Sequence, residues 1–206
     1  MTPKQVCKHI LQSGWGDEAG IERLRGYAEE LAKWQKRINL VAPSTLPQLW
    51  ERHILDSAQV MPLLPDAARH VADFGSGGGL PVVVMACLDQ SGRRFTAVES
   101  VGKKAQFLKH CARLLDLPLT VENKRIEDLP PLQADLVTAR ALADLGQLIN
   151  WATPHLAPDG GMLFLKGERA EQETAALASD HQQNWVITST PSLTNHQADI
   201  LTLTRA

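Results

Sequence analysis

The chain has 206 residues, of which 44 % are hydrophobic and 21 % are charged; these ordinary values fit one globular domain and exclude a disordered, collagen-like or coiled-coil protein. Its 21 basic and 23 acidic residues leave a formal net charge of -2, so binding to nucleic acid would need local basic patches. The three cysteines form no CxxC pair, and no apolar run is long enough to span a bilayer. We therefore expect a cytoplasmic protein without disulfides, structural metal or membrane anchor.

The first third of the chain is predicted to be helical. Asp17 can cap a helix over residues 17–36, in which apolar side chains recur at three- and four-residue spacing. A loop follows over residues 38–45, and Thr45 then precedes a second helix that ends near Pro62. Residues 1–12 lack the apolar core of a signal peptide, and no separate helix is assigned to them.

From His70 onward, short β-rich runs alternate with helical stretches. The strands are expected at residues 71–74, 95–98, 119–121, 136–139 and 162–165, and the helices at 81–88, 103–115, 144–153 and 169–180. Two further runs, 185–189 and 199–203, are joined by a turn-like segment and predict an antiparallel hairpin. This α/β pattern is typical of class I SAM-dependent methyltransferases, whose Rossmann-like sheet is mostly parallel and seven-stranded, but the analogy alone fixes no function.

The chain is expected to have two parts. Residues 1–66 would form an N-terminal helical extension, and residues 67–206 would form the α/β domain on which the extension packs. We expect the two parts to make one compact unit, because a chain of this length fits a single domain with a small appendage.

A glycine-rich loop follows the first strand of the α/β region. Residues 71–81 read VADFGSGGGLP, so a buried strand runs into a flexible loop and then into a helix, whose first N–H groups are free to bind a ligand. A dinucleotide fingerprint that starts at Gly75 would need glycine at position 80, which is Leu80, and no P-loop lysine follows. The spacing Asp73-x-Gly75-x-Gly77-x-Gly79 instead resembles the loop that binds S-adenosylmethionine (SAM), where the acidic residue anchors the loop.

Residues after the next two strands support this interpretation. Glu99 ends the second strand, where a carboxylate can accept hydrogen bonds from both ribose hydroxyls of a bound nucleoside. Ile126 and Glu127 follow the third strand, where this fold holds the adenine. The alternative is an ordinary glycine-rich turn with two surface acids, but the loop, the acid and the βα alternation together favour SAM binding.

Absent motifs narrow the methyl acceptor. The fourth strand ends in TARAL, which lacks the Asn/Asp-Pro-Pro-aromatic motif of enzymes that methylate exocyclic amines of bases. Carbon-5 methylation of pyrimidines needs a nucleophilic cysteine, whereas Cys87 and Cys111 lie in predicted helices and are expected to be buried structural thiols.

Several short motifs together resemble the glucose-inhibited division protein B family, the bacterial 16S rRNA guanine-N7 methyltransferases. They include RHILDS at 52–57, the loop DFGSGGGLP at 73–81, SVGKK at 100–104 and LKG at 165–167, together with Trp34, Asn39-Leu40 and Arg140-Ala141. The combination of the first two motifs is specific to the family. Gly78 stands where the family usually has proline and Val82 where it usually has glycine, and a more flexible loop here would weaken cofactor affinity.

The resemblance implies a reaction and a set of site residues. The cofactor would be SAM, and the substrate would be N7 of guanine 527, in the standard rRNA numbering, within the 16S rRNA of the small ribosomal subunit. The residues implied to contact the cofactor are Gly75 and Leu80, with Glu99 at the ribose, Ile126 and Glu127 at the adenine, and Arg140 beside both the cofactor and the target base. Guanine N7 has a lone pair and no proton, so we expect catalysis by positioning and no general base.

Polar residues outside the cofactor loop are candidates for contact with RNA. His53 and Asp56 lie three residues apart on one helix face, which suits either a hydrogen-bond network that docks the N-terminal helices or a contact with RNA. Basic residues that follow the strands can meet phosphates, although charged runs are often only solvated faces. The RNA-binding candidates are Asn39, His53, Lys103, Lys104, Arg125 and Lys166.

Two other functions stay open from the sequence. The slightly acidic balance favours a small-molecule SAM-dependent methyltransferase, whereas the RHILDS motif opposes it. A non-catalytic ribosome-assembly factor with the same fold is compatible with the departures at Gly78 and Val82, but the intact Asp73 and Glu99 oppose it. Under the favoured hypothesis the partner is 16S rRNA in the small subunit, and the enzyme is a monomer without a metal.

Overall fold

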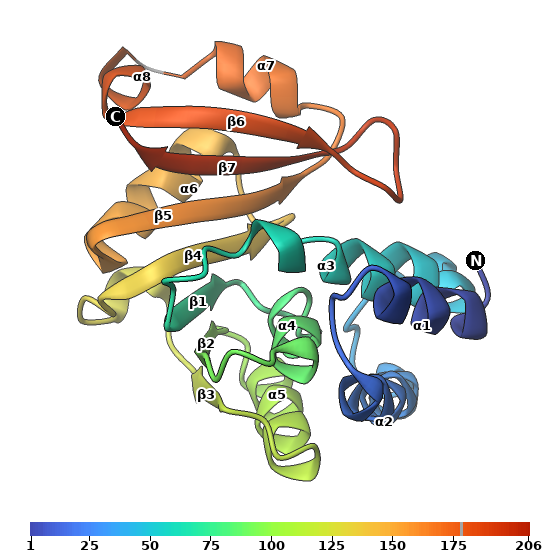
Figure 1. Cartoon of the computed structure of the whole chain (residues 1–206). Helices are drawn as coiled ribbons and strands as arrows, with labels where there is room; N and C mark the ends of the chain where they lie inside the picture. Colours follow the sequence, from blue (N-terminus) through green and yellow to red (C-terminus); the bar gives the residue numbers. More distant parts are fainter. Residues whose placement is uncertain (178) are drawn as a thin grey trace.

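The computed structural model describes residues 1–177 and 179–206 and is built around a seven-stranded sheet (Figure 1). The strand order is β3-β2-β1-β4-β5-β7-β6; β7 is antiparallel to both of its neighbours, and the remaining pairs are parallel. The strands are β1 (His70–Phe74), β2 (Arg94–Val98), β3 (Leu119–Glu122), β4 (Ala134–Arg140), β5 (Leu156–Lys166), β6 (Trp185–Pro191) and β7 (Asp199–Arg205). The predicted Rossmann-like sheet with a terminal antiparallel hairpin is confirmed.

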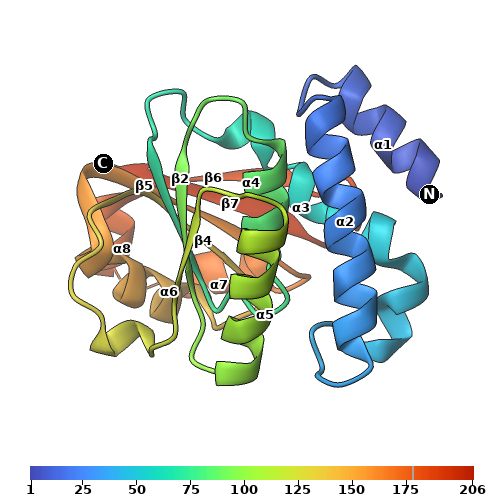
Figure 2. The same ribbon diagram turned by 90° about the horizontal axis from the view of Figure 1, so that it is seen from below.

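Helices cover both faces of the sheet (Figure 2). α4 (Val82–Leu88) and α5 (Gly102–Leu114) lie on one face, and α6 (Leu145–Ala152), α7 (Ala170–Ala175) and α8 (Ser179–Asn184) lie on the other. Successive side chains of β1 alternate between the two layers, with Val71 in the cluster that includes α4 and α5 and Ala72 in the cluster that includes α6. Because both faces are buried, the inner strands are mostly apolar, and their polar residues, such as Asp73 and Thr138, are buried with them.

The chain begins with two helices, of which α2 (Glu18–Gln35) packs against α4 and α1 (Pro3–Gln12) packs against η2 (Trp50–Leu55). In α2, Asp17 Oδ1 accepts a hydrogen bond from the Gly20 N–H at 2.7 Å, which confirms the predicted helix and its cap. α1, which was not predicted, begins with a capping box between Thr2 and Gln5. Its buried residues, Val6, Cys7 and Ile10, have helical spacing, so the sequence does carry a signal for this helix.

The prediction of one continuous second helix is wrong. Residues 43–63 form four short pieces: η1 (Pro43–Gln48), η2 (Trp50–Leu55), α3 (Asp56–Ala58) and η3 (Met61–Leu63). Pro47 lies inside η1 and has no N–H to donate, which prevents a regular helix there. η2 is wound as a wide π-helical turn, a form that is frequent at functional sites, and it carries Arg52 and His53.

The predicted helix over residues 169–180 is also divided. α7 ends at Ala175 and α8 begins at Ser179, while position 178 lies outside the described residues. The hairpin prediction is confirmed, since β6 pairs with β7 from Trp185↔Arg205 to Pro191↔Asp199. In the part of the chain described here, no helix is both long and apolar enough to cross a membrane.

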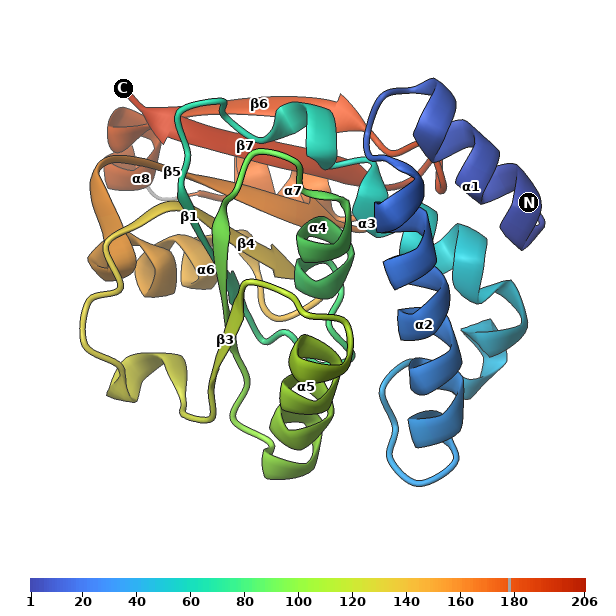
Figure 3. The same cartoon turned by 60° about the horizontal axis from the view of Figure 1, so that its bottom comes forward.

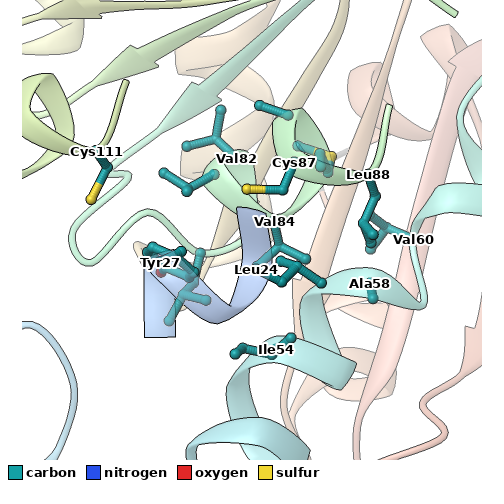
Figure 4. Close-up of a cluster of buried hydrophobic side chains, with 14 of the residues drawn as sticks. Leu24, Tyr27, Ile54, Ala58, Val60, Val82, Val84, Cys87, Leu88 and Cys111 are labelled. Carbon is teal, nitrogen blue, oxygen red and sulfur yellow. The ribbon is translucent and has the colours of Figure 1, made fainter. Parts of the chain in front are cut away.

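A single apolar cluster joins the N-terminal helices to the sheet. Figure 3 shows α2 alongside α4 and α5, and the close-up in Figure 4 shows Leu24 and Tyr27 of α2 among Val82, Val84 and Leu88 of α4. All five side chains are at most 1 % exposed. We propose from this continuity that residues 1–66 and 67–206 unfold as one cooperative unit.

The topology brings the candidate residues to one edge of the sheet. β2 lies on one side of β1 and β4 on the other, so the strand order reverses at β1. In open α/β sheets, ligands bind outside the carboxyl ends of the strands at this reversal. Asp73, Glu99 and Arg140 lie at or next to the carboxyl ends of β1, β2 and β4.

Candidate active site

The loop after β1 is bonded to the neighbouring strand and fits tightly against the helix that follows. The N–H groups of Gly75 and Ser76 donate to the Val98 carbonyl oxygen at 2.9 and 3.2 Å. Gly79 has a φ of +88°, and a Cβ there would lie 2.5 Å from Val83 Cγ2, so no other residue fits without movement. The loop therefore forms a fixed backbone cradle at the carboxyl edge of the sheet.

Glu99 ties this cradle to the loop after β2. The side chain is 5 % exposed; its Oε2 accepts from the Gly77 N–H at 2.8 Å and its Oε1 from the Val101 N–H at 2.7 Å. A carboxylate has about four lone-pair sites, so each oxygen still has one site for a ligand hydroxyl. This arrangement fits a ribose at Glu99.

Asp73 is a buried carboxyl group with one unused oxygen. Its Oδ1 accepts from Thr138 Oγ1 at 2.7 Å, whereas Oδ2 has no hydrogen-bond partner among the described residues. Burial raises the pKa of Asp73 to about 7, because the ionised form loses its hydration there. An unpartnered buried acceptor is costly, and a cationic ligand such as the methionine ammonium of SAM would satisfy it.

We expect the substitution Asp73→Asn to stabilise the ligand-free protein at pH 8 while weakening SAM binding at least tenfold. The folded-state pKa lies above the ordinary value of 3.8, so the folded protein holds the extra proton and loses stability as pH rises from about 4 through 7. Asparagine removes this loss, so the Tm at pH 8 should rise. Calorimetric affinity for SAM should increase from pH 6 to 8 in the wild type and stay flat in the variant; parallel profiles would contradict the role of Asp73.

Leu142 covers the side of Gly75 from which a side chain would project. An added Cβ on Gly75, whose φ is +64°, would lie 2.6 Å from Leu142 Cδ1. Leu142 follows Ala141, which has a φ of +52°, so the chain turns sharply after β4. A ligand that packs on Gly75 therefore requires the Leu142 side chain to rotate away.

The two residues predicted to border the adenine differ in burial. Ile126, in η4 (Ile126–Asp128), is buried in the same apolar cluster as Phe74 and Val98. The Glu127 side chain is 47 % exposed and lies 4.0 Å from Arg125 Nε. Leu80, at 5 % exposure, belongs to the apolar cluster on the opposite face. Ile126 is therefore an apolar, buried residue at this edge, and Glu127 is a polar residue open to solvent.

Both departures from the family loop are covered by α2. Tyr27, which is fully buried, donates its hydroxyl to the Gly78 carbonyl oxygen at 2.5 Å. A Cβ on Gly78 would lie 3.1 Å from the Leu40 carbonyl oxygen, so the loop after α2 also lies against this position. Val82 is fully buried beside Tyr27 (Figure 4). α2 thus restrains a turn that the glycine-rich sequence predicts to be flexible.

We expect Tyr27→Phe to lower the free energy of unfolding by about 1–2 kcal/mol, because the buried Gly78 carbonyl loses its donor. The loop should also become less well placed, so SAM affinity should fall a few-fold. Denaturant unfolding and calorimetry measure the two effects separately. The sequence predicts only an apolar face for this helix, whereas the hydroxyl of Tyr27 contacts a residue 51 positions away in the chain. Unchanged affinity despite the lost stability would show that the contact is purely structural.

Arg140 ends β4 and is held by two residues of the RHILDS motif. Its Nη1 lies 3.2 Å from Asp56 Oδ2, and both terminal nitrogens lie 3.3 Å from His53 Nδ1. His53 Nε2 lies 2.7 Å from Thr45 Oγ1. Burial, with Arg140 beside it, lowers the pKa of His53 to about 4, so the neutral ring can accept a hydrogen bond from the guanidinium.

The same network reaches the loop between β6 and β7. Asp56 Oδ1 accepts from Thr194 Oγ1 at 2.6 Å and from Gln59 Nε2 at 2.9 Å. The sequence predicts a network that docks the N-terminal helices or a contact with RNA, and the structure joins η2 and α3 both to the sheet and to Arg140. Thr45, Gln59 and Thr194 were not predicted as site residues, because their partners are distant in sequence or on irregular segments.

A cleft of about 660 Å³ opens beside Arg140. It is lined by polar residues of η2 and α3, by the segment after β4, by the segment after β5 and by the β6–β7 loop, including His53, Asp56, Arg140, Leu142, Arg169, Thr194 and Asn195. The volume suits a flexible small molecule or a nucleotide. Leu142 lies on its wall, so the cleft adjoins the cradle at Gly75.

The basic and polar candidates are placed differently around this edge. Lys103 is exposed and Lys104 half-buried at the start of α5, close in sequence to Glu99, and Arg125 is 73 % exposed beyond β3. Asn39 is exposed next to Leu40, which lies against Gly78. Lys166 lines the cleft, but it is only 9 % exposed; its Nζ is 2.6 Å from Glu173 Oε2 and donates to the Ala143 carbonyl at 2.7 Å. That pairing fixes the segment after β4.

Neither a nucleophilic cysteine nor a metal site is found among the described residues. Cys7, Cys87 and Cys111 are free and buried, and burial raises the pKa of the Cys87 thiol to about 12. No group of three or more His, Cys, Asp or Glu side chains among the described residues could hold a metal ion. The thiols are therefore poor nucleophiles.

The fold and the cradle define a class I SAM-dependent methyltransferase. Solved structures with this fold include a SAM-dependent methyltransferase from Aquifex aeolicus, with a TM-score of 0.60, 12 % identity and coverage of 86 % of this chain and 97 % of that one. A SAM-dependent O-methyltransferase from Thermotoga maritima gives a TM-score of 0.59 at 16 % identity, with 87 % and 71 % covered. At such low identity these structures show the fold alone.

Sequence relatives identify the family. Residues 20–201 match the family model of GidB, rRNA small subunit methyltransferase G, and the chain belongs to that family. A ribosomal RNA small subunit methyltransferase G from Paramagnetospirillum magneticum is 50 % identical over 197 residues, which cover 95 % of this chain and 91 % of the relative. The protein of the same name from Gluconobacter oxydans is 44 % identical, with 82 % and 86 % covered. The family resemblance expected from the sequence motifs is confirmed, and the cofactor is SAM.

Proposed function

We propose that the protein transfers a methyl group from SAM to N7 of a guanine in the 16S rRNA of the small ribosomal subunit. The observation that carries the proposal is Arg140, which His53 and Asp56 hold between the SAM cradle and the 660 Å³ cleft of a member of this family. The family resemblance implies guanine 527 as the position. Bound SAM supplies an electrophilic methyl group on a positively charged sulfur.

The residues proposed to hold SAM divide by the part of the molecule that they meet. Asp73 would accept from the methionine ammonium through its unpartnered Oδ2, and the backbone of Gly75 and Gly77 would line the methionine. Glu99 would accept the ribose hydroxyls. The adenine would lie on Ile126, with Glu127 at the rim and Leu80 behind the loop.

The chain acts on the guanine by positioning. N7 has an in-plane lone pair and carries no proton, so no side chain has to remove one. Arg140 can stack on the guanine or donate to its O6, and a 1 Å misplacement in such a site costs on the order of 100-fold in rate. Methylation makes the base cationic; Asp56 beside the guanidinium offsets the positive charge of Arg140.

The remaining assignments follow from the substrate. Lys103, Lys104, Arg125 and Asn39 lie around the same edge and would contact phosphates or sugars, which position the RNA without reading its sequence. We place the enzyme in the cytoplasm, where small subunits are assembled, and expect it to act as a monomer.

The experiment is transfer of labelled methyl from SAM to small subunits that lack this modification, with nucleoside mass analysis and mapping of the modified position. One 7-methylguanosine in the expected loop is the supporting result. Transfer to a different atom or nucleotide would refute the assigned position, and SAM binding without any transfer to RNA would favour a small-molecule substrate.

A further inference from the structure

The loop between β6 and β7 presents an exposed leucine at the edge of the cleft. β6 is antiparallel to β7, which is antiparallel to β5, so this loop lies at the same edge of the sheet as the carboxyl ends of β4 and β5 (Figure 1). Leu193 is 60 % exposed, the highest exposure among the large hydrophobic side chains of the described residues. A single exposed leucine is common on proteins, so exposure alone carries no function.

Hydrogen bonds to Gln59 and Asp56 fix the chain around Leu193. The Leu193 N–H donates to Gln59 Oε1 at 2.7 Å, and Gln59 Nε2 donates to Ser192 Oγ at 3.1 Å. On the other side, Thr194 Oγ1 donates to Asp56 Oδ1 at 2.6 Å. Ser192 and Thr194 thus direct their hydroxyls toward the protein, and Leu193 between them remains exposed. An apolar side chain is therefore presented on a fixed loop.

Leu193 is also fixed relative to the residue proposed to hold the base. Asp56 binds Thr194 through one oxygen and Arg140 through the other. Ser192, Thr194 and Asn195 form one wall of the cleft, and Arg140 lies on it as well. Leu193 does not line the cleft itself, but it lies in the chain between two residues that do, beside the cavity that would receive the target guanine.

We propose that Leu193 is an RNA wedge, a side chain that inserts beside the nucleotide next to the target guanine and fills the gap left when that guanine enters the cleft. The inference rests on the proposed function. Enzymes that act on one base remove it from its stack, and apolar side chains such as leucine commonly occupy the space between unstacked bases. A wedge needs a rigid support, which Gln59 and Asp56 provide.

The test compares Leu193→Ser with Val186→Ser. Val186 is the other exposed large apolar residue of this hairpin, 52 % exposed near the start of β6 and thus toward the opposite edge of the sheet. We expect Leu193→Ser to keep the wild-type Tm and SAM affinity but to lower kcat/KM for small subunits about tenfold or more, because the gap left by the unstacked guanine would no longer be filled by an apolar side chain. Leu193→Phe, which keeps a large apolar side chain, should retain activity close to that of the wild type, and Val186→Ser should match the wild type.

Equal kcat/KM for Leu193→Ser and wild type would overturn the wedge, as would a similar loss in Val186→Ser. A photo-crosslinking amino acid at position 193 adds a readout that does not depend on turnover. We expect a crosslink to the rRNA nucleotide beside the methylated guanine, and a crosslink to a ribosomal protein would overturn the proposal. If the wild type neither methylates nor binds small subunits, the proposed function fails, and the wedge fails with it.

Discussion

Replacing Gly75 by aspartate is expected to abolish SAM binding while the protein still folds. Gly75 has a φ of +64°, which costs a residue with a side chain about 1–2 kcal/mol, and aspartate tolerates this conformation better than most. The new Cβ would meet the end of the Leu142 side chain, which can rotate away. The carboxylate would then occupy the ligand-facing side of the cradle and repel the carboxylate end of the cofactor.

Calorimetry should show at least 100-fold weaker SAM binding for Gly75→Asp, with a Tm within a few degrees of the wild type. The matched control is Gly92→Asp. Gly92 has a similar φ of +71°, and a Cβ there meets nothing within 4 Å, so the substitution carries the same backbone strain two residues before β2, away from the cradle. Wild-type SAM affinity in Gly75→Asp would show that the cofactor does not lie on this loop.

The sheet could be predicted because its physical signals are local. A parallel strand buried on both faces has a continuous apolar sequence, and the helices between the strands have their own periodicity. Glycines with positive φ, such as Gly75 and Gly79, mark the cradle directly. Strand ends place Glu99 and Arg140 at one edge once the topology is known.

Contacts between segments that are distant in the chain could not be predicted from the sequence. Gln59 and Ser192 are 133 positions apart, and Tyr27 and Gly78 are 51 apart. No periodicity links such pairs, and each depends on how two elements pack. The π-helical turn of η2 is also hidden, because its residues suit an ordinary helix and only the docking against β4 explains how His53 and Asp56 reach Arg140.

Lys166 shows that a basic residue after a strand can be buried and paired within the protein instead of being free for RNA. Its place after the fifth strand suggested a contact with phosphate, but its ammonium group pairs with Glu173 and with the Ala143 carbonyl. Both partners come from outside the strand, so the sequence pattern contained neither. We propose that Lys166 instead fixes the segment that carries Leu142.

Replacing Arg140 by alanine is expected to lower kcat/KM for methyl transfer by about 100-fold or more while leaving SAM affinity within a few-fold of the wild type. Arg140 is proposed to lie beside the cofactor and to meet the guanine, whereas Asp73, Glu99 and the glycine loop are proposed to make most of the contacts to SAM. Asp56 keeps its hydrogen bonds from Thr194 and Gln59, so the free energy of unfolding should fall by only about 1–2 kcal/mol.

The decisive comparison is between Arg140→Ala and Arg140→Lys. Lysine keeps the positive charge beside Asp56 but has no planar fork that can stack on guanine or donate two parallel hydrogen bonds, so it should recover stability without recovering rate. Arg25→Ala, which removes an exposed arginine of α2 paired with Glu22, controls for the loss of one positive charge and should behave as wild type. Full activity in Arg140→Lys would reduce Arg140 to a charge that balances Asp56, and full activity in Arg140→Ala would remove it from the active site.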